Sequence, residues 1–496
     1  MMTPPKITLP QKPQTKKITF DISIYSVFQK LEGRFDECFL LESLAEGSDS
    51  RYTILGFSPE SVISGNGKTL TVNGKDYTVK NPYLALRAMM PKHVLTHGFV
   101  GGLIGYMSYE ASEFFEPSLK LHHHKDFDQF RFGLYTDGLI YDKTTGETLY
   151  FYYRKNRLPE LVKMLKAGSR EKKEKTQVQF KGFSLSEAGH RSMVEAVKEK
   201  ITAGYTFQCE VGFRASFELT GSALPLYEEL RKVNPSPHMY YITFGLPAAR
   251  PPSRGQATSV AQAGKQVVLG ASPELLFELK DGEMQTFPLA GTVKRGKNEA
   301  EDQVLARKLV NDPKERAEHS MLVDLHRNDL GRVARFGTVR VRKLMEVKKF
   351  SHVQHLSSEI TGLIAPEHDM FSALASSFPA GTLSGAPKIE SMKIIDANEK
   401  TGRGPYGGAV GFFGFNGNCM FAIPIRSLYV HGKDMYTQTS GGIVYDSTPK
   451  NEYQEILHKL RATQIALQKF SSSAPLQRGS AESSRRRGDS YIRRNS

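Results

Sequence analysis

The chain has 496 residues, a formal net charge of +15, 39% hydrophobic residues and 24% charged residues. This balance is typical of a folded globular protein, and no apolar run approaches the ~18–20 residues that span a bilayer, so we expect no membrane segment. The basic charge permits a nucleic acid, an acidic surface or a small anionic substrate as a partner.

Part of the positive charge lies in residues 471–496, which are rich in Ser and Arg and almost free of large aliphatic side chains. Such a segment buries too little apolar area to offset the entropy lost on ordering, so we expect a disordered basic tail. A solvated tail is favoured over contact with nucleic acid.

Three cysteines, Cys38, Cys209 and Cys419, are far apart in the chain and show no metal-ligand spacing. The N-terminus has no apolar stretch after its charged residues and does not look like a signal peptide. Both observations favour a reducing, cytoplasmic location, where the thiols are expected to be small buried hydrophobic side chains.

Residues 1–167 are predicted to form a first, strand-rich domain. Within it, residues 61–79 alternate apolar and polar side chains around glycine-containing turns, which is typical of β-hairpins. The charged residues 168–183 predict a linker. Residues 184–470 form the second predicted domain, which opens with a helix over 186–204 because its apolar residues recur at helical spacing.

Two pairs of glutamates share helix faces in the second domain. Glu315 and Glu318 lie three residues apart in one helical stretch. Glu452 and Glu455 have the same spacing in the last helix, which begins near Pro449. Carboxylates from two helices suit Mg²⁺, a hard cation that prefers oxygen ligands. The alternative is that these glutamates only compensate the helix dipoles.

Three further segments combine small residues with Ser or Thr and are typical of anion-binding turns: PLAGTVKRG, FPAGTLSGAPK and QTSGGIVYDS. Arg426 lies inside the apolar run CMFAIPIRSLYV and needs an anionic partner. Together these features indicate a cavity for a dicarboxylate, which an arginine binds through two hydrogen bonds. A structural salt bridge of Arg426 is the alternative.

In chain order, the motifs of the second domain resemble those of the chorismate-utilising enzyme family. They are FQCEVGFR, NPSPHMYY, GASPELLFEL, PLAGTVKRG, AEHSMLVDLHRNDLGRV, FSHVQHLSSEITG, FPAGTLSGAPK, GPYGGAVGFF, IPIRS, GGIVYDS and EYQEILHKL. In the first domain, LLES and GGLIGYMSYE resemble the large subunits of anthranilate synthase and of aminodeoxychorismate synthase. The resemblance implies an α+β fold in which large antiparallel β-sheets pack as a sandwich with helices outside.

The resemblance also implies a Mg²⁺-dependent lyase that converts chorismate and ammonia to anthranilate and pyruvate in tryptophan biosynthesis. By the family's pattern, Glu318 and Glu455 hold Mg²⁺, with Glu315 and Glu452 beside them. The residues implied in contact with the substrate are Gly291, Thr292, Tyr406, Arg426, Gly441 and Gly442. His355 is implied as the general acid for the departing C4 hydroxyl, and Thr382 as a contact near it.

Two positions separate the branches of the family. Water-using members have a lysine base where this chain has Gln208, and ammonia, already a nucleophile, needs only positioning. Aminodeoxychorismate synthases have a nucleophilic lysine where this chain has Ala290. The anthranilate branch is therefore favoured. The alternatives are aminodeoxychorismate synthase component I, in the folate pathway, and a basic RNA-associating protein on an inactive version of the fold.

The sequence contains no glutaminase-like region with a cysteine nucleophile and a paired histidine. The resemblance therefore implies that a separate glutamine amidotransferase subunit supplies the ammonia. It also implies a feedback site for L-tryptophan, formed by Ser43 of LLES and by Pro237, His238 and Met239 of NPSPHM, where the family has tyrosine at the histidine position.

This chain departs from the family near its end. Where the family often has QAGAG, this chain has Gln438, Thr439, Ser440, Gly441 and Gly442. The last glycine is kept, so the substrate pocket is still implied. The hydrogen bonds around it are expected to differ, because Ser440 adds a hydroxyl group.

Overall fold

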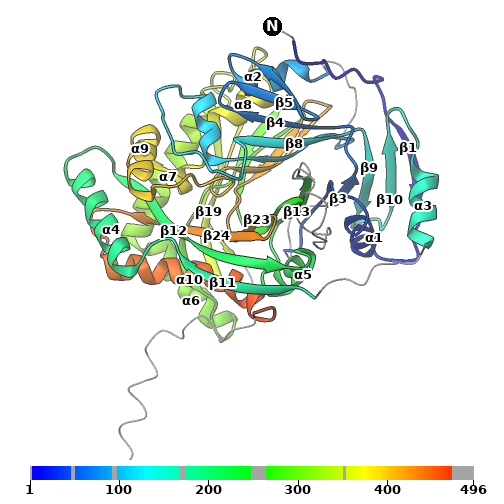
Figure 1. Cartoon of the computed structure of the whole chain (residues 1–496). Coiled ribbons are helices and arrows are strands. Elements are labelled where there is room, and N and C mark those ends of the chain that lie inside the picture. The colour runs from blue at the N-terminus through cyan, green and yellow to red at the C-terminus, as the bar shows by residue number, and fades with distance from the viewer. Residues whose placement is uncertain are drawn as a thin grey trace, which may run out of the picture.

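The computed structural model describes residues 3–45, 51–91, 98–167, 175–246, 264–349 and 353–471. Within these residues, two antiparallel β-sheets of twelve strands each form the centre of the molecule, and helices lie around them (Figure 1). The predicted α+β sandwich is confirmed. No helix of the described ranges is both long and apolar enough to span a lipid bilayer.

The first sheet contains β1, the first strand of the described chain. In spatial order its strands are β1 (Gln14–Ile18), β10 (Thr148–Tyr152), β9 (Asp137–Asp142), β3 (Tyr52–Phe57), β2 (Cys38–Glu42), β13 (His238–Gly245), β14 (Lys265–Ser272), β23 (Ser427–His431), β24 (Asp434–Ile443), β12 (Gln208–Thr220) and β11 (Gln177–Phe183). The short strand β20 (Gly385–Ala386) also pairs with β12.

The second sheet packs on the first. In spatial order its strands are β17 (Leu289–Lys294), β19 (Val353–Leu363), β16 (Glu283–Thr286), β15 (Leu275–Lys280), β22 (Cys419–Ala422), β21 (Ala409–Gly414), β7 (Gly102–Met107), β8 (Phe130–Tyr135), β4 (Ser61–Asn66), β5 (Thr69–Val72) and β6 (Lys75–Thr78). The edge strand β18 (Arg340–Lys349) pairs with the free side of β19.

Both sheets combine strands from the N-terminal and C-terminal parts of the chain. In the first sheet β2 pairs with β13, and in the second β7 pairs with β21. Residues 177–183, assigned to the linker from sequence, form β11 against β12. Residues 168–174 of that linker, and residues 472–496 of the predicted tail, lie outside the described residues.

The helices cover the outer faces and the ends of the sheets (Figure 1). They are α1 (Ile24–Glu32), α2 (Pro82–Met89), α3 (Leu158–Lys166), α4 (Glu187–Thr202), α5 (Leu224–Val233), α6 (Glu299–Asn311), α7 (Pro313–Gly331), α8 (Met370–Ser377), α9 (Lys388–Glu399) and α10 (Pro449–Gln468), with the 3-10 helices η1 (Tyr109–Phe114) and η2 (Gly381–Leu383). The helix predicted over 186–204 is confirmed as α4.

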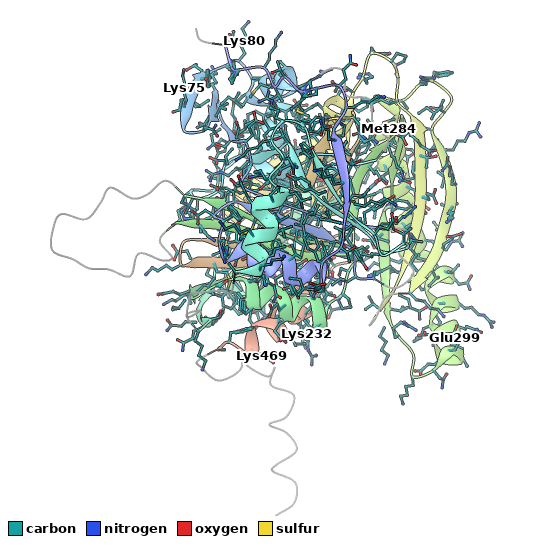
Figure 2. All side chains as sticks on the ribbon, turned by 90° about the vertical axis from the view of Figure 1, so that its right-hand side faces the viewer. Lys75, Lys80, Lys232, Met284, Glu299 and Lys469 are labelled. Carbon is teal, nitrogen blue, oxygen red and sulfur yellow. The ribbon has the colours of Figure 1, made fainter. Side chains whose placement is uncertain are left out.

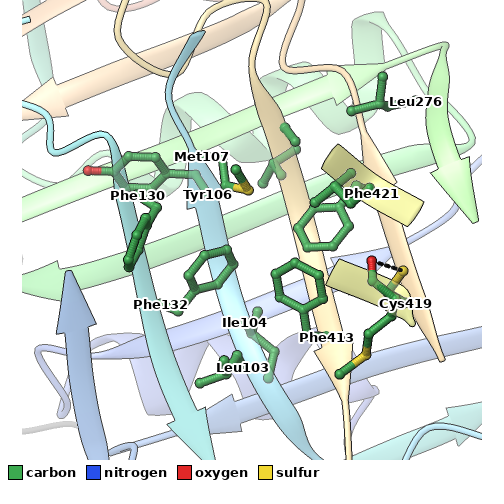
Figure 3. Close-up of a cluster of buried hydrophobic side chains, with 14 of the residues drawn as sticks. Leu103, Ile104, Tyr106, Met107, Phe130, Phe132, Leu276, Phe413, Cys419 and Phe421 are labelled. Atoms are coloured by element: carbon green, nitrogen blue, oxygen red, sulfur yellow. Dashed lines mark hydrogen bonds between the residues drawn. The ribbon is translucent and has the colours of Figure 1, made fainter. Parts of the chain in front are cut away.

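The main core lies between the two sheets and is rich in aromatic side chains. Figure 3 shows part of it, where β7, β8, β21 and β22 meet. Phe413 and Phe421 have ring centroids 4.7 Å apart, and Phe413 also stacks on Phe371 of α8 at 4.1 Å. Cys419 belongs to this core, and its Sγ lies 3.9 Å from the carbonyl oxygen of Met370. Alternating apolar residues along antiparallel strands explain this arrangement, since every second side chain faces inward.

A second core lies between the first sheet and the helices outside it. Val27 and Phe28 of α1, Leu230 of α5 and Leu467 of α10 pack there against the sheet. Cys38 is fully buried in this core, so the prediction of buried thiols is confirmed for it, as it is for the other two cysteines. Helices, first sheet and second sheet thus form successive layers held by apolar burial.

Charged side chains populate the surface around these layers. In Figure 2, Lys75 and Lys80 lie at one end of the molecule and Lys232 and Lys469 at the other. Lys232 and Lys469 are both ion-paired with Glu229, at 2.9 and 2.6 Å. These four lysines therefore lie at two ends of the molecule rather than together on one face.

Candidate functional site

The two predicted glutamate pairs lie in the first turns of α7 and α10. The N-terminus of α7 is capped by Asp312, whose side chain accepts hydrogen bonds from the backbone N–H groups of Lys314 and Glu315. Pro313 occupies the first turn of α7, as Pro449 does in α10, where the missing N–H costs nothing. These helix starts therefore orient the glutamates that follow them.

The structure brings carboxylates of the two helices close enough to interact. Burial and the negative charges of Glu315 and Glu455 raise the pKa of Glu318. Burial also raises the pKa of Glu315, and the negative charge of Glu455 adds to this increase. The negative charge of Glu455 disfavours the charged forms of its two neighbours, and a bound cation would relieve that repulsion.

One oxygen of the cluster has no hydrogen-bond partner among the described residues. Glu452 Oε2 is buried and accepts no hydrogen bond from any residue that the structure describes. A buried carboxylate oxygen without a donor is costly unless a cation or water satisfies it. The oxygen-rich donor set thus fits Mg²⁺ in its chemistry. Across the described ranges, however, no three or more His, Cys, Asp or Glu side chains already stand in metal-holding geometry.

Gln208 joins this cluster from the first sheet. It begins β12, is 5% exposed, and its Nε2 donates a hydrogen bond to Glu318 Oε1 at 3.4 Å. Its backbone pairs with Ala386 of β20, directly after η2. The side chain predicted to position ammonia therefore lies beside a predicted metal ligand.

Gly291, Thr292 and His355 come together where β17 pairs with β19. Gly291 has φ +65°, and a Cβ there would lie 2.7 Å from Glu315 Oε2, so this position requires glycine. Its carbonyl oxygen accepts a hydrogen bond from His355 Nδ1 at 3.1 Å. Thr292 pairs with His355 through its backbone, but its side chain lies outside the described residues.

Arg426 stands in a strained backbone conformation just before β23. Its φ of +52° is uncommon for a residue with a side chain and costs ~1–3 kcal/mol. Its guanidinium makes no hydrogen bond or ion pair with any part of the chain that the structure describes, although Glu274 lies near enough to stabilise its charge. A mostly buried arginine without a bound carboxylate is suited to an anionic ligand.

The serine that departs from the family pattern links two site residues. Tyr406 and Ser440 are each 2% exposed, and their hydroxyl oxygens lie 2.8 Å apart. Ser440 Oγ in turn donates to Glu210 Oε2 at 2.8 Å. Since the carboxylate only accepts, the chain of donation runs from Tyr406 through Ser440 to Glu210.

Gly441 and Gly442 of β24 lie close to polar side chains of two different elements. A Cβ at Gly441 would lie 3.2 Å from Glu452 Oε2. A Cβ at Gly442 would lie 2.6 Å from Gln208 Nε2 and 2.8 Å from Glu210 Oε1. A side chain at Gly442 would displace the amide of Gln208 and the carboxylate of Glu210, which explains glycine there, whereas a Cβ at Gly441 would only make a tight contact with Glu452.

Sequence reasoning missed Glu274. This residue follows β14, is 6% exposed, and its Oε1 accepts a hydrogen bond from Thr382 Oγ1 at 3.0 Å. Burial raises its pKa to about 8. By contrast, burial together with the charge of Arg426 lowers the pKa of His355 to about 4. The available signal was a glutamate inside the apolar run GASPELLFEL, which was used for the resemblance without a role.

Lys459 was also missed. It lies one helical turn after Glu455 in α10, and its Nζ forms an ion pair with Glu455 Oε1 at 2.8 Å. The same Nζ donates to the carbonyl oxygen of Ser440 at 2.9 Å. The signal in the sequence was the i, i+4 spacing of glutamate and lysine, which is ordinarily a solvated helix pair.

A second group of predicted residues meets where β2 pairs with β13. Met239 pairs in register with Glu42, the neighbour of Ser43, and Leu44 N–H donates to the carbonyl oxygen of Ser236 at 2.9 Å. Ser43 is 3% exposed. Pro237 and His238 lie between these contacts, so the structure brings together all four residues predicted for tryptophan from distant parts of the chain.

Comparisons with known proteins agree with this architecture. The chorismate binding enzyme family matches residues 36–464. Anthranilate synthase component 1 of Leptospira biflexa is 49% identical over 472 residues, covering 94% of this chain and 98% of that protein. The solved structure of anthranilate synthase component I from Streptococcus pneumoniae has a TM-score of 0.73 at 30% identity, covering 89% of this chain and 97% of that chain.

The chain therefore belongs to the chorismate binding enzyme family. Within that family, it is similar to the proteins named anthranilate synthase component 1, as the motifs predicted. Aminodeoxychorismate synthase component 1 of Bacillus subtilis is a more distant relative, 35% identical over 483 residues that cover 92% of this chain and 97% of that protein. The order of these identities agrees with the alanine at position 290.

Proposed function

We propose that this chain catalyses the amination of chorismate by ammonia, which yields anthranilate and pyruvate and feeds tryptophan biosynthesis. The observation that carries the proposal is the contact of Gln208 with Glu318, which places an uncharged amide beside the carboxylate cluster. An amide in this position suits a nucleophile that needs orientation but no base of lysine strength.

In this proposal the substrate is held by charge at two places. Arg426 binds a carboxylate of chorismate, which supplies the partner that its guanidinium lacks among the described residues. Glu318 and Glu455 would hold Mg²⁺, with Glu315 and Glu452 beside them. The ion, when bound, supplies positive charge that clamps and polarises the ring carboxylate.

Glu274 supplies the proton that the C4 hydroxyl needs in order to leave as water. Its pKa of about 8 keeps it protonated at neutral pH, and Thr382 holds its carboxyl group in place. Glu274 thereby takes the acid role that the motifs implied for His355. With a pKa of about 4, His355 is neutral at pH 7, and its Nδ1 proton is held by Gly291. His355 then orients the substrate as a hydrogen-bonding group.

Ammonia adds at C2 of the ring from the side of Gln208, and elimination of pyruvate then makes the ring aromatic. Ala290 lies in β17 with no nucleophilic group. A covalent attack on C2 by the protein, which the aminodeoxychorismate branch would require, therefore has no residue at this position.

The ammonia is proposed to come from glutamine through a separate amidotransferase subunit, since the relatives are named component 1. A protein partner that covers the site would keep ammonia from being protonated in bulk water. The three buried, unpaired cysteines suit a reducing cytoplasm.

Feedback by L-tryptophan is proposed at the group formed by Ser43, Pro237, His238 and Met239. His238 pairs in register with Ser272 of β14, and the backbone N–H of Glu274 donates to Ser272 Oγ at 3.2 Å. A ligand that shifts β13 would therefore act on the acid through one neighbouring strand.

Incubating the chain with chorismate, Mg²⁺ and an ammonium salt at mildly alkaline pH tests the proposal. Mass spectrometry should find anthranilate and pyruvate in equal amounts, and EDTA should abolish both. Aminodeoxychorismate without pyruvate would assign the chain to the other branch. If the chain forms no product but binds RNA and is retained on a heparin column, the alternative would be favoured, namely an RNA-associating protein on an inactive version of the fold.

A further inference from the structure

Glu210 is a buried carboxylate that the mechanism above does not use. It lies on β12, two residues after Gln208, and is 7% exposed. Alternate residues of a strand share one face, so Gln208 and Glu210 face the same side of the sheet. The backbone of Glu210 is anchored at both ends, because its N–H donates to the carbonyl of Ser384 at 3.0 Å and its carbonyl accepts from Arg403 at 2.7 Å.

The two oxygens of this carboxylate have different surroundings. Oε2 accepts the hydrogen bond of Ser440, the residue that replaces a family glycine. Oε1 receives no hydrogen bond from any described residue, and it lies against Gly442 together with Gln208 Nε2, each within 2.8 Å of where a Cβ on that glycine would be. One carboxylate oxygen is thus fixed by the protein, while the other points to the place where the nucleophile is proposed to stand.

We propose that Glu210 is a further catalytic residue, whose Oε1 binds the attacking ammonia beside Gln208 and accepts a proton from it after the C–N bond forms. This inference rests on the proposed amination. Ammonia has three N–H donors and one lone pair, so acceptors on one side of it direct the lone pair to the ring carbon opposite. The carboxylate oxygen Oε1 accepts an N–H of ammonia, and its charge also attracts the ammonium ion, from which ammonia is released.

The proton balance closes without another reactant. The lone pair of ammonia forms the C2–N bond, the ring double bonds shift, and the C4–O bond breaks as Glu274 protonates the departing oxygen. The nitrogen on C2 now carries one proton too many. Its N–H bond breaks and an O–H bond forms at Glu210 Oε1, so one carboxyl group loses the proton that the other gains.

The electrostatic surroundings of Glu210 suit both protonation states near neutral pH. Burial raises its pKa to about 7, and Glu455 adds to the increase, while Lys459, the Ser440 hydrogen bond and Arg403 oppose it. Glu274 is the other carboxyl that interacts with it, since Glu210 contributes to the raised pKa of Glu274. A group balanced in this way gives up and takes a proton with little cost.

The decisive variant is Glu210→Gln, which keeps the size of the side chain and removes its charge. With an ammonium salt as nitrogen source, its KM for ammonium should rise by about tenfold or more, whereas its KM for chorismate should change less than about twofold. The acidic limb of its kcat–pH profile should also disappear. Glu210→Asp should recover part of the loss. Glu278→Gln, a change of a half-buried glutamate in β15, serves as the control with unchanged kinetics.

The possible results distinguish a failure of the role of Glu210 from a failure of the proposed function. Equal increases of both KM values, or an unchanged KM for ammonium and an unchanged pH profile, would overturn the role of Glu210. If Glu210→Gln fails to fold, Ser440→Ala replaces it. Loss of the hydrogen bond to Oε2 should then raise the KM for ammonium by about two- to fivefold, and an unchanged KM for ammonium would overturn the inference. A wild-type chain that forms no anthranilate would overturn the proposed function itself, separately from Glu210.

Discussion

Carboxylates at the starts of α7 and α10 differ from those in the first sheet. Burial raises the pKa of Glu315 and of Glu318, and the negative charge of Glu455, on the other helix, adds to the increase in both. Glu210 and Glu274 are instead set into or beside strands, each with one hydroxyl donor, from Ser440 and Thr382. Burial is the largest cause of the raised pKa in all four carboxylates, and the pKa reaches about 7 for Glu210 and about 8 for Glu274.

The comparison teaches that the same residue type acquires two chemistries from its neighbours. Several carboxylates together repel and are stabilised by a divalent cation. A deeply buried carboxylate whose pKa lies near neutral is stabilised by a proton instead. The helix starts are therefore suited to hold a metal, and the buried pair is suited to move protons.

The largest effect is expected from Glu274→Gln. Removing a general acid lowers the rate by about 10²–10⁴-fold, while chorismate and Mg²⁺ should still bind. In the wild type, the acid is competent only while protonated, so kcat should fall as the pH rises through about 8. Stopped-flow rates at saturating ammonium across pH 6–10 measure this. If Glu274→Gln keeps the alkaline limb of the kcat–pH profile, another group donates the proton to the departing hydroxyl.

A smaller loss is expected from Glu318→Gln and from Glu455→Gln. Each removes one charge from the predicted metal site, so Mg²⁺ binding measured by calorimetry should weaken by about 10–100-fold, with activity following it. Raising the Mg²⁺ concentration should restore part of the rate. Glu346→Gln, on the exposed strand β18, should behave as the wild type. If both site variants bind Mg²⁺ as tightly as the wild type, the metal site is not at the starts of α7 and α10.

Arg426→Lys tests how the substrate anion is held. A lysine keeps the charge but loses the two parallel N–H groups, so the KM for chorismate should rise by about tenfold or more. Arg340→Lys, at an exposed position of β18, is the matched control. An unchanged KM would mean that the strained arginine serves the fold rather than the ligand.

The smallest effect is expected from Gly291→Ala. A left-handed φ costs about 1–2 kcal/mol for alanine, and the added Cβ would meet Glu315 as well. Gly74→Ala has a similar φ of +76° but open space around it, so it isolates the backbone cost. Denaturant titration should show a larger loss of unfolding free energy at position 291. If both variants lose the same unfolding free energy, the Glu315 carboxylate does not lie against Gly291.

Local pattern predicted the elements well where the residues carried their own signal. The strands between 61 and 79 follow from alternation and glycine turns, and the last helix follows from Pro449 and its apolar stripe, in which Ile456 and Leu460 are buried. The glutamate pairs were likewise recognised from their three-residue spacing in helical segments. Gln208 was recognised from its position in a family motif. The tail beyond residue 471 stays a prediction, because residues 472–496 lie outside the described residues.

Other features depended on strand partners far away in the chain. The pairing of β2 with β13 and of β7 with β21 mixes the two parts of the sequence within each sheet. No local pattern encodes such partners, because alternation specifies only which side chains face inward and not which strand lies alongside.

The motifs were therefore sufficient to indicate the family, and the resemblance to that family implied the sandwich of antiparallel strands and most of the candidate site. The roles proposed for Glu210, Glu274 and His355 depended on the tertiary structure. A protonation state is set by burial and by the charges that converge from other elements, and both arise only when strands and helices distant in sequence pack together.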